Sequence, residues 1–222
     1  MYGDQDFQKC LNMSSQTLLI EGLPGVGKSC LLHGLIQQTI ETGRTLCPTV
    51  VSYTFNSKQS PSVRKFLLTL LRQIWKQNEN TSHDCMQKLK ADFAKPQVKS
   101  ERIVATITEA INGAESNTCF FIDALDECEA IILNRMMDHL FSIQGSTGMG
   151  LVMTTRLGCV ASLNHRENIT RRTFNADDND IQYWIEAAYK RMAREEGTKR
   201  PWLERVNAIH IRNEIKRTSK GM

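Results

Sequence analysis

Hydrophobic residues along the chain fall into short apolar runs that are separated by longer amphipathic segments. The runs are Thr17–Ile20, Thr49–Phe55, Thr118–Ile122, Leu151–Thr155 and Asn168–Phe174. Runs of this length that are rich in β-branched and aromatic residues predict strands. Thr118–Ile122 is almost wholly apolar, which is typical of a central strand in a parallel sheet that is covered on both faces.

The segments between these runs carry apolar residues at helical spacing. In Ser62–Lys76 an apolar stripe predicts an amphipathic helix; it consists of Val63, Phe66, Leu67, Leu70, Leu71 and Ile74. The other expected helices are a short one that ends near Asn12, one from a glycine-rich loop to about Thr42, His83–Phe93, Glu101–Asn112, one that ends near Ile143, Asp177–Tyr189 and Trp202–Arg217. A turn is expected at Gly145–Gly150.

Strands that alternate with helices predict an α/β fold with a doubly wound parallel sheet. We expect five strands in the order 5-1-4-3-2, an order that follows from the fold class, so that the first and third strands flank the fourth. We expect a lead-in segment at 1–16, an α/β core at 17–174 and a short C-terminal helical extension at 175–222.

The segment between the first strand and the next helix carries the clearest chemistry. Gly22–Ser29 reads Gly-Leu-Pro-Gly-Val-Gly-Lys-Ser and fits the phosphate-binding pattern G-x-x-x-x-G-K-S/T. The glycines let the backbone curl and bring N–H groups close to a polyphosphate. Lys28 is expected on the β- and γ-phosphates, and the Ser29 hydroxyl on Mg²⁺. The residues expected to bind the nucleotide are Gly22, Leu23, Pro24, Gly25, Val26, Gly27, Lys28, Ser29 and Cys30.

Acidic residues follow the third strand. Asp123 stands at the tip of this apolar strand, where in this fold class an aspartate holds Mg²⁺, usually through water. Hydrolysis also needs a carboxylate that orients the attacking water, and Asp126 and Glu127 are near enough along the chain. We favour Glu127, with Asp126 assisting. The alternative is that these acids only cap the following helix.

Arg156 ends the fourth strand, beside the strand that leads into the phosphate loop. An arginine at this place can reach a γ-phosphate or report its loss. The alternative, on position alone, is an ordinary surface arginine after a strand.

The three motifs together resemble the NACHT-type NTPases of the STAND class of signal-transducing P-loop ATPases, in particular the fungal-type NACHT and nephrocystin-like N-terminal modules. The resemblance is carried by Gly22–Ser29, by Phe120–Glu127 and by Met153–Arg156. It implies that Ser29 and Asp123 hold the metal, that Asp126 and Glu127 support hydrolysis, and that Arg156 is the sensor arginine.

Members of this class work as switches that are closed with a nucleoside diphosphate and oligomeric with a triphosphate. The resemblance therefore implies a module that binds ATP or GTP with Mg²⁺, hydrolyses it slowly and controls the oligomerisation of a larger NLR-like protein. In a full-length context its partners are effector and repeat domains. We find no effector, winged-helix or repeat pattern in the sequence. We therefore expect either a fragment of a longer protein or a gene product reduced to its P-loop NTPase core, residues 17–174.

Composition indicates which classes of partner and which cellular compartment to expect. The net charge of +4, from 28 basic and 24 acidic residues, is a mild excess, so nucleic acid is not an expected partner. Seven cysteines without a C-x-x-C pair indicate a reducing compartment, and Cys30, Cys119 and Cys128 are expected to be buried. With no signal peptide pattern and no apolar run of membrane-spanning length, we expect a cytoplasmic protein that contacts no membrane.

Other functions stay open. One is an interaction scaffold that retains nucleotide with little or no hydrolysis. A small-molecule kinase would need an arginine-rich lid, and a regulatory GTPase usually carries an N/T-K-x-D motif; we find neither in the sequence. A DNA-directed ATPase is supported only by the mild basic excess. ATP and GTP cannot be distinguished, because no base-contacting motif stands out.

Overall fold

The computed structural model of the chain describes residues 5–12, 15–42, 49–58, 62–77, 98–114, 117–160, 163 and 168–175. The chain divides into two compact units. The first consists of Met1–Gly22 with Lys28–Thr173, and the second of Leu23–Gly27 with Phe174–Met222. Every helix and strand described below belongs to the first unit.

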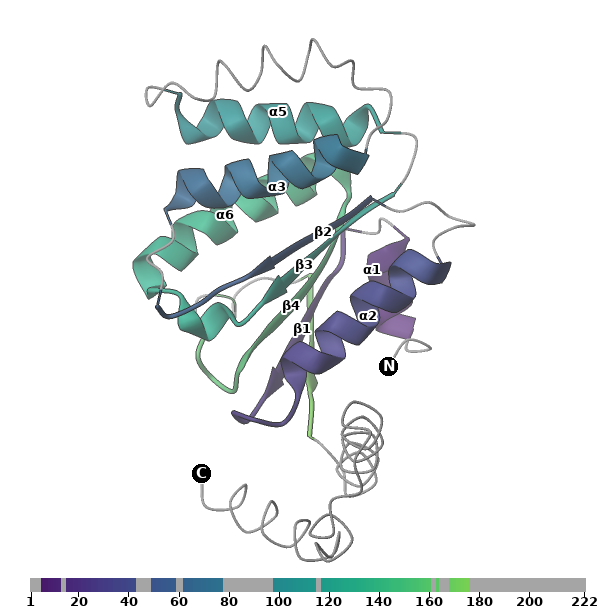
Figure 1. The fold of residues 1–222 in the computed structure, drawn as a ribbon, viewed down its shortest axis with the longest axis vertical. Coiled ribbons are helices and arrows are strands. Elements are labelled where there is room, and N and C mark those ends of the chain that lie inside the picture. The colour runs from purple at the N-terminus through teal and green to yellow at the C-terminus, as the bar shows by residue number, and fades with distance from the viewer. Residues whose placement is uncertain are drawn as a thin grey trace, which may run out of the picture. The chain divides into compact units, whose positions relative to one another are not determined.

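A five-stranded parallel sheet forms the centre of the first unit (Figure 1). Its strands are β1 (Thr17–Gly22), β2 (Thr49–Thr54), β3 (Thr118–Asp123), β4 (Gly150–Arg156) and β5 (Ile169–Thr173). The order is β2-β3-β4-β1-β5, which confirms the predicted order read from the opposite edge. β4 pairs in parallel with both β1 and β3, so the strands of the phosphate loop and of Asp123 flank the strand of Arg156.

Helices cover both faces of the sheet. They are α1 (Gln5–Leu11), α2 (Lys28–Thr42), α3 (Val63–Gln77), α5 (Ser100–Asn112) and α6 (Ala130–Thr147), with a 3₁₀ turn, η1, at Leu125–Glu127. Figure 1 shows α3, α5 and α6 on one face and α1 and α2 on the other. Every residue of β1 and β3 is buried, as the apolar run at the third strand predicted.

The predicted apolar stripe of α3 forms part of the main hydrophobic core. Phe66, Leu70 and Ile74 are fully buried in a cluster that also holds Ile103 and Ile107 of α5. Burying a side chain of this size contributes about 1.5–3 kcal/mol relative to leaving it in water. The three helices on this face are therefore held to the sheet mainly by apolar packing.

The C-terminal end of α6 corrects one prediction. The turn expected at Gly145–Gly150 is wrong, because α6 continues through Gly145 to Thr147. The helix ends at Gly148, whose φ of 72° is the left-handed conformation that commonly closes a helix. The extra turn is retained because the buried Gln144 donates hydrogen bonds to the carbonyl oxygens of Gln16 and Met149.

Three predicted helices, His83–Phe93, Asp177–Tyr189 and Trp202–Arg217, lie outside the described residues. The predicted C-terminal extension lies outside them too, apart from residue 175. The other predicted helices and strands are confirmed, with ends that differ from the prediction by a few residues. Among the described residues, no helix is long and apolar enough to cross a membrane.

The N-terminal helix α1 packs closely against the sheet. Phe7 is fully buried, and its ring centroid lies 6.4 Å from that of Phe121 on β3. A Cβ atom added to Gly150 would lie 1.7 Å from the carbonyl oxygen of Cys10. The backbones of α1 and β4 therefore approach each other at a distance that only glycine permits.

Two glutamine side chains of α3 cover the free edge of β2. The amide of Gln73 donates to the Ser52 carbonyl at 2.8 Å and accepts from the Ser52 N–H at 2.9 Å. Gln77 donates to the Val50 carbonyl at 2.7 Å and accepts from the Val50 N–H at 3.0 Å. These backbone groups of an edge strand are therefore paired within the chain.

Candidate functional site

The predicted site residues of the first unit gather at one edge of the sheet. Since all the strands are parallel, their carboxyl ends meet at this edge, which is where ligands bind in open α/β sheets. The register pairs Gly22 at the end of β1 with Arg156 at the end of β4. Asp123 ends the adjacent strand β3, and Lys28 begins the helix that follows β1.

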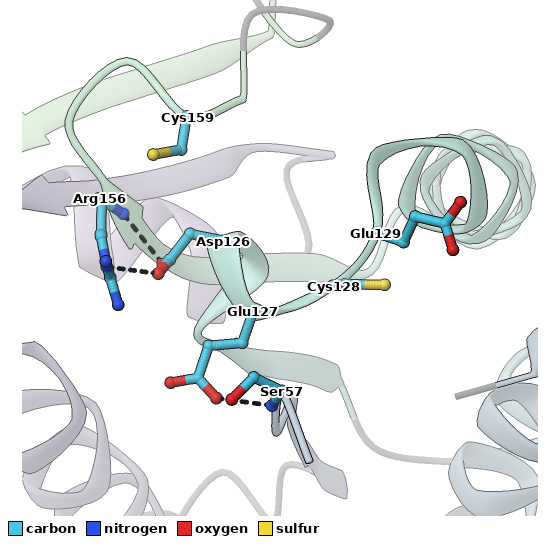
Figure 2. Close-up of a pocket in the computed structure, with 7 residues that line it drawn as sticks. All are labelled: Ser57, Asp126, Glu127, Cys128, Glu129, Arg156 and Cys159. Atoms are coloured by element: carbon cyan, nitrogen blue, oxygen red, sulfur yellow. Dashed lines mark hydrogen bonds and ion pairs between the residues drawn. The ribbon is translucent and has the colours of Figure 1, made fainter. Parts of the chain in front are cut away.

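Asp126 and Arg156 form a two-point contact (Figure 2). Arg156 Nε lies 2.8 Å from Asp126 Oδ2, and the Arg156 backbone N–H donates to Asp126 Oδ1 at 3.0 Å. The Asp126 side chain is 9% exposed, whereas that of Arg156 is 51% exposed. The carboxylate is therefore fixed by the end of β4, while the guanidinium keeps access to solvent.

Glu127 links η1 to the segment after β2. Its Oε2 accepts a hydrogen bond from the Ser57 N–H at 3.0 Å, as Figure 2 shows. Ser57 was not among the predicted site residues. The only signal for it in the sequence is its position after an apolar strand, because the carboxyl ends of neighbouring parallel strands converge.

A cavity of about 340 Å³ lies beside these two contacts. It is lined by Ser57, Asp126, Glu127, Cys128, Glu129, Arg156 and Cys159. Burial raises the pKa of the Cys128 thiol, and the charge of Glu129 acts in the same direction. The lining of the cavity is mostly polar. The raised pKa keeps the half-buried Cys128 thiol in its neutral form.

The cysteine predictions are confirmed only in part. Cys119 is buried, as predicted, and burial raises the pKa of its thiol well above the ordinary value. Cys128 is half-buried, and the prediction for Cys30 is wrong, because its side chain is exposed. The buried face of α2 carries Leu32 and Leu35, and Cys30 falls outside this helical stripe.

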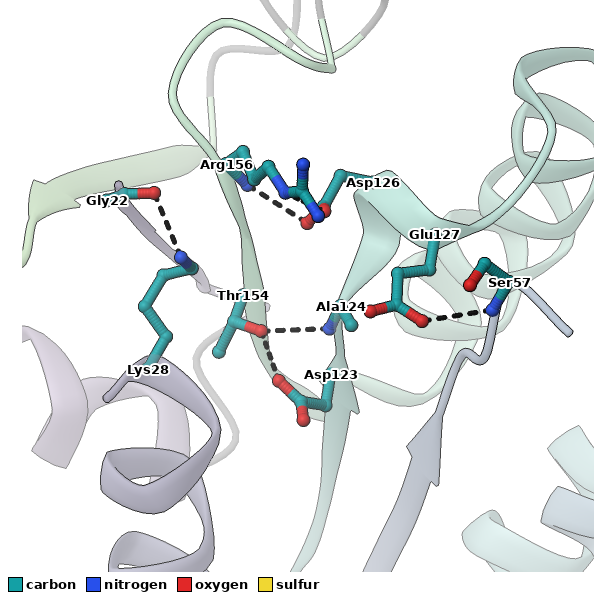
Figure 3. A network of polar contacts seen from close by, with 9 residues as sticks. All are labelled: Gly22, Lys28, Ser57, Asp123, Ala124, Asp126, Glu127, Thr154 and Arg156. Carbon is teal, nitrogen blue, oxygen red and sulfur yellow. Dashed lines mark hydrogen bonds and ion pairs between the residues drawn. The ribbon is translucent and has the colours of Figure 1, made fainter. Parts of the chain in front are cut away.

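Asp123 is almost fully buried, with 6% of its surface exposed. Figure 3 shows the Thr154 hydroxyl between Asp123 and Ala124: it donates to Asp123 Oδ1 and accepts from the Ala124 N–H at 2.9 Å. Ala124 has a φ of 58°, in the left-handed region that non-glycine residues rarely adopt. The chain therefore turns sharply directly after the carboxylate.

Lys28 points toward the same edge of the sheet. Its ammonium donates to the Gly22 carbonyl at 2.9 Å (Figure 3). Burial lowers the pKa of Lys28, a shift that the carboxylate of Asp126 opposes and the charge of Arg156 assists. Asp123 also acts on this pKa, so the lysine lies within electrostatic reach of both aspartates.

The loop Leu23–Gly27 belongs to the second unit. Gly25 and Gly27 have φ values of 78° and 94°. A Cβ atom at either position would meet no atom within 4 Å, so the backbone conformation and not space requires glycine there. These are the curled glycine positions that the phosphate-binding pattern contains.

The donor atoms of the site fit Mg²⁺. Asp123 supplies a carboxylate and Ser29 a hydroxyl, and Mg²⁺ prefers such oxygen ligands. Among the described residues, no group of three or more His, Cys, Asp and Glu side chains could hold a metal ion by itself. Mg²⁺ typically takes one or two protein ligands and fills its other positions with water and substrate phosphates.

The strand order together with the strand–loop–helix motif defines the fold as that of a P-loop NTPase. Within this class, the family model for the N-terminal region of nephrocystin 3 matches residues 1–156. The match covers well over half of the sequence, and the chain belongs to this family. A comparison with curated proteins found no match.

Two solved structures from Aeropyrum pernix share the fold. The ADP form of its ORC2 protein has a TM-score of 0.57 and 12% identity, and covers 83% of this chain and 49% of that one. Its ORC1 protein in complex with DNA has a TM-score of 0.58 and 11% identity, and covers 83% of this chain and 48% of that one. The chain thus spans about half the length of these proteins, and at this identity the likeness concerns the fold alone.

Proposed function

We propose that the chain is a nucleotide-binding module that takes ATP or GTP with Mg²⁺ and hydrolyses it slowly. The observation that carries the proposal is the position of Lys28 at the sheet edge where Asp123 ends β3. A phosphate-binding lysine and a buried carboxylate close to each other are the two groups that a nucleotide–Mg²⁺ complex requires.

Each residue has one role in this proposal. The loop from Gly22 to Ser29 binds the phosphates through its N–H groups, and Lys28 places its charge on them. Ser29 and Asp123 hold Mg²⁺, which neutralises charge on the β- and γ-phosphates when it is bound. The first turn of α2 adds the positive end of its helix dipole.

Glu127 is the better candidate for orienting the attacking water. Both oxygens of Asp126 contact Arg156, so this carboxylate has little freedom to act on water. Only Oε2 of Glu127 accepts a hydrogen bond among the described residues, and its Oε1 is left for a water molecule. Asp126 then contributes by holding Arg156, which is the proposed sensor of the γ-phosphate.

We further propose that nucleotide controls the oligomerisation of a larger NLR-like protein that carries effector and repeat domains. In this proposal residues 17–174 are the NTPase core, 1–16 lead into it, 175–222 begin a helical extension, and the protein acts in the cytoplasm. The match to the nephrocystin 3 N-terminal family supports this context. The alternative is a scaffold that retains nucleotide without turnover.

Calorimetric titration of the purified chain with ATP, ADP, GTP and GDP, with and without Mg²⁺, tests the proposal. We expect Mg²⁺-dependent binding of one triphosphate, and loss of binding in Lys28→Ala. Lys65→Ala, which changes an exposed lysine on α3, is the control and keeps the affinity. Unchanged affinity in Lys28→Ala would refute the phosphate-loop assignment.

Steady-state phosphate release separates the switch from the scaffold. A measurable rate that is lost in Glu127→Gln, with nucleotide affinity retained, supports hydrolysis. Tight binding without phosphate release supports the scaffold.

DNA should be tested as a further ligand of the chain. One of the similar structures is a complex with DNA, so the prediction that nucleic acid is not a partner has no support. Salt-dependent DNA binding near physiological ionic strength would add that partner.

A further inference from the structure

The hydroxyl of Thr154 has a fixed direction. It accepts from the Ala124 N–H at 2.9 Å, and its single proton goes to Asp123 Oδ1. Thr154 is fully buried on β4, which is a central strand with β3 and β1 on either side, so its side chain is enclosed by the sheet and its covering residues. A β-branched side chain in a strand also has a restricted χ1 angle. The threonine is therefore a rigid donor to the carboxylate.

We propose that Thr154 is the positioning residue of the metal-binding carboxylate. By holding Oδ1 of Asp123, it leaves Oδ2 as the oxygen that serves Mg²⁺. Among the described residues, Oδ2 of Asp123 accepts no hydrogen bond. This inference rests on the proposed function, in which Asp123 binds the metal, and it adds a residue that contacts neither metal nor nucleotide.

The local backbone explains why the carboxylate needs such a partner. Asp123 is the last residue of β3, and Ala124 directly after it is in the left-handed conformation. At this turn the regular pairing of the strand ends, and the Thr154 hydroxyl supplies the partner for the Ala124 N–H. One side chain thus fixes both the turn and the carboxylate. Groups that orient metal ligands in this way typically contribute 10- to 100-fold in metal affinity.

Thr155 provides a matched control on the same strand. It is also fully buried, but among the described residues its hydroxyl has no hydrogen-bond partner. Thr154→Val and Thr155→Val remove the same atoms at adjacent positions and keep the shape of the side chain. Thr154→Ser keeps the hydroxyl and removes only the methyl group.

The experiment measures nucleotide affinity across a Mg²⁺ titration and in EDTA, with thermal unfolding of each variant. We expect Thr154→Val to raise the Mg²⁺ concentration for half-maximal effect about tenfold or more, with unchanged affinity in EDTA. Thr154→Ser and Thr155→Val are expected to stay within about twofold of the wild type, well below the range for losing such a group. An unchanged Mg²⁺ dependence in Thr154→Val, or an equal loss of affinity in EDTA, would overturn the inference.

Crystal structures of the Thr154→Val and Thr154→Ser chains decide the same question without nucleotide. We expect the Asp123 carboxyl to rotate in the first variant and to keep its direction in the second. The same carboxyl orientation in both variants would overturn the inference. Failure of the wild type to bind any nucleotide would instead refute the proposed function, so the two failures are distinguishable.

Discussion

The side-chain amide of Gln73 makes with Ser52 the two backbone hydrogen bonds that a neighbouring strand would make. Gln77, one helical turn later, does the same with Val50. The spacing explains the match, because four helical residues rise about 6 Å and two strand residues about 6.6 Å. α3 thereby occupies the edge of β2, where an exposed strand would invite pairing with another chain.

Replacing both glutamines, as in Gln73→Ala with Gln77→Ala, should expose this edge. We expect a loss of about 1 kcal/mol in the free energy of unfolding for each glutamine, since each loses hydrogen bonds to the strand. We also expect self-association at high protein concentration. Urea unfolding and sedimentation velocity measure the two effects. Lys76→Ala on the same helix is the control, and equal behaviour of both variants would show that the amides do not protect the edge.

Substitution of Gly150 should reveal the close packing of α1. Gly150→Ala places a Cβ atom against the Cys10 carbonyl, and such overpacking typically costs about 1–3 kcal/mol. Gly145→Ala is the matched control, because it lies within α6 with no atom within 4 Å of the added Cβ. There we expect stabilisation of about 0.5–1 kcal/mol from the higher helix propensity of alanine. Thermal or urea unfolding of the two variants tests whether their changes in the free energy of unfolding have opposite signs.

Arg156→Gln should separate triphosphate from diphosphate binding. If the arginine reaches the γ-phosphate, its removal costs a charge-assisted hydrogen bond of about 1.5–3 kcal/mol, which is at least a tenfold loss of triphosphate affinity. Diphosphate affinity should stay the same. The ion pair with Asp126 contributes little to stability, because the guanidinium is half-exposed. Equal losses for both nucleotides would contradict the sensor role.

Nucleotide affinity should fall as the pH rises, and this fall should begin at a pH below the ordinary pKa of a lysine side chain. The pKa of Lys28 is lowered mainly by burial, and the bound phosphates favour its protonated form. The complex therefore binds more protons than the free chain, so affinity decreases as pH rises through the lowered pKa. Titration calorimetry in buffers of different ionisation enthalpy measures this proton uptake. Lys28→Arg should remove the pH dependence, because arginine stays charged.

The strands of the sheet could be predicted from the sequence, because each apolar run had the length of a strand. The place of the site could be predicted because each motif lay at the end of a strand. The strand order was predicted from the fold class, and the gathering of Gly22, Asp123 and Arg156 at one edge followed from the place of each motif at the end of a strand. The predicted end of α6 was wrong, because Gly145 resembles a residue that ends a helix. The hydrogen bonds of Gln144 that stabilise the longer helix are tertiary contacts, which the local sequence does not show.

Side-chain hydrogen bonds between separate strands and loops could not be predicted in the same way. The bond from Ser57 to Glu127 and the bonds of Thr154 to Asp123 and Ala124 join residues 30 or more positions apart. Neither hydrophobic period nor motif spacing encodes them. The pairing of Asp126 with Arg156 was equally hidden, although both residues were identified as site residues.

β4 holds both aspartates of the site, Asp123 through Thr154 and Asp126 through Arg156. The two β4 residues are two positions apart and so belong to the same face of the strand. A slip of β4 by one residue would turn both side chains to the opposite face and release both aspartates at once. Assembly of the site and correct pairing of the central strand are therefore one event. Nucleotide binding by this chain should therefore report on its folding, because a molecule in which β4 is out of register lacks an assembled site.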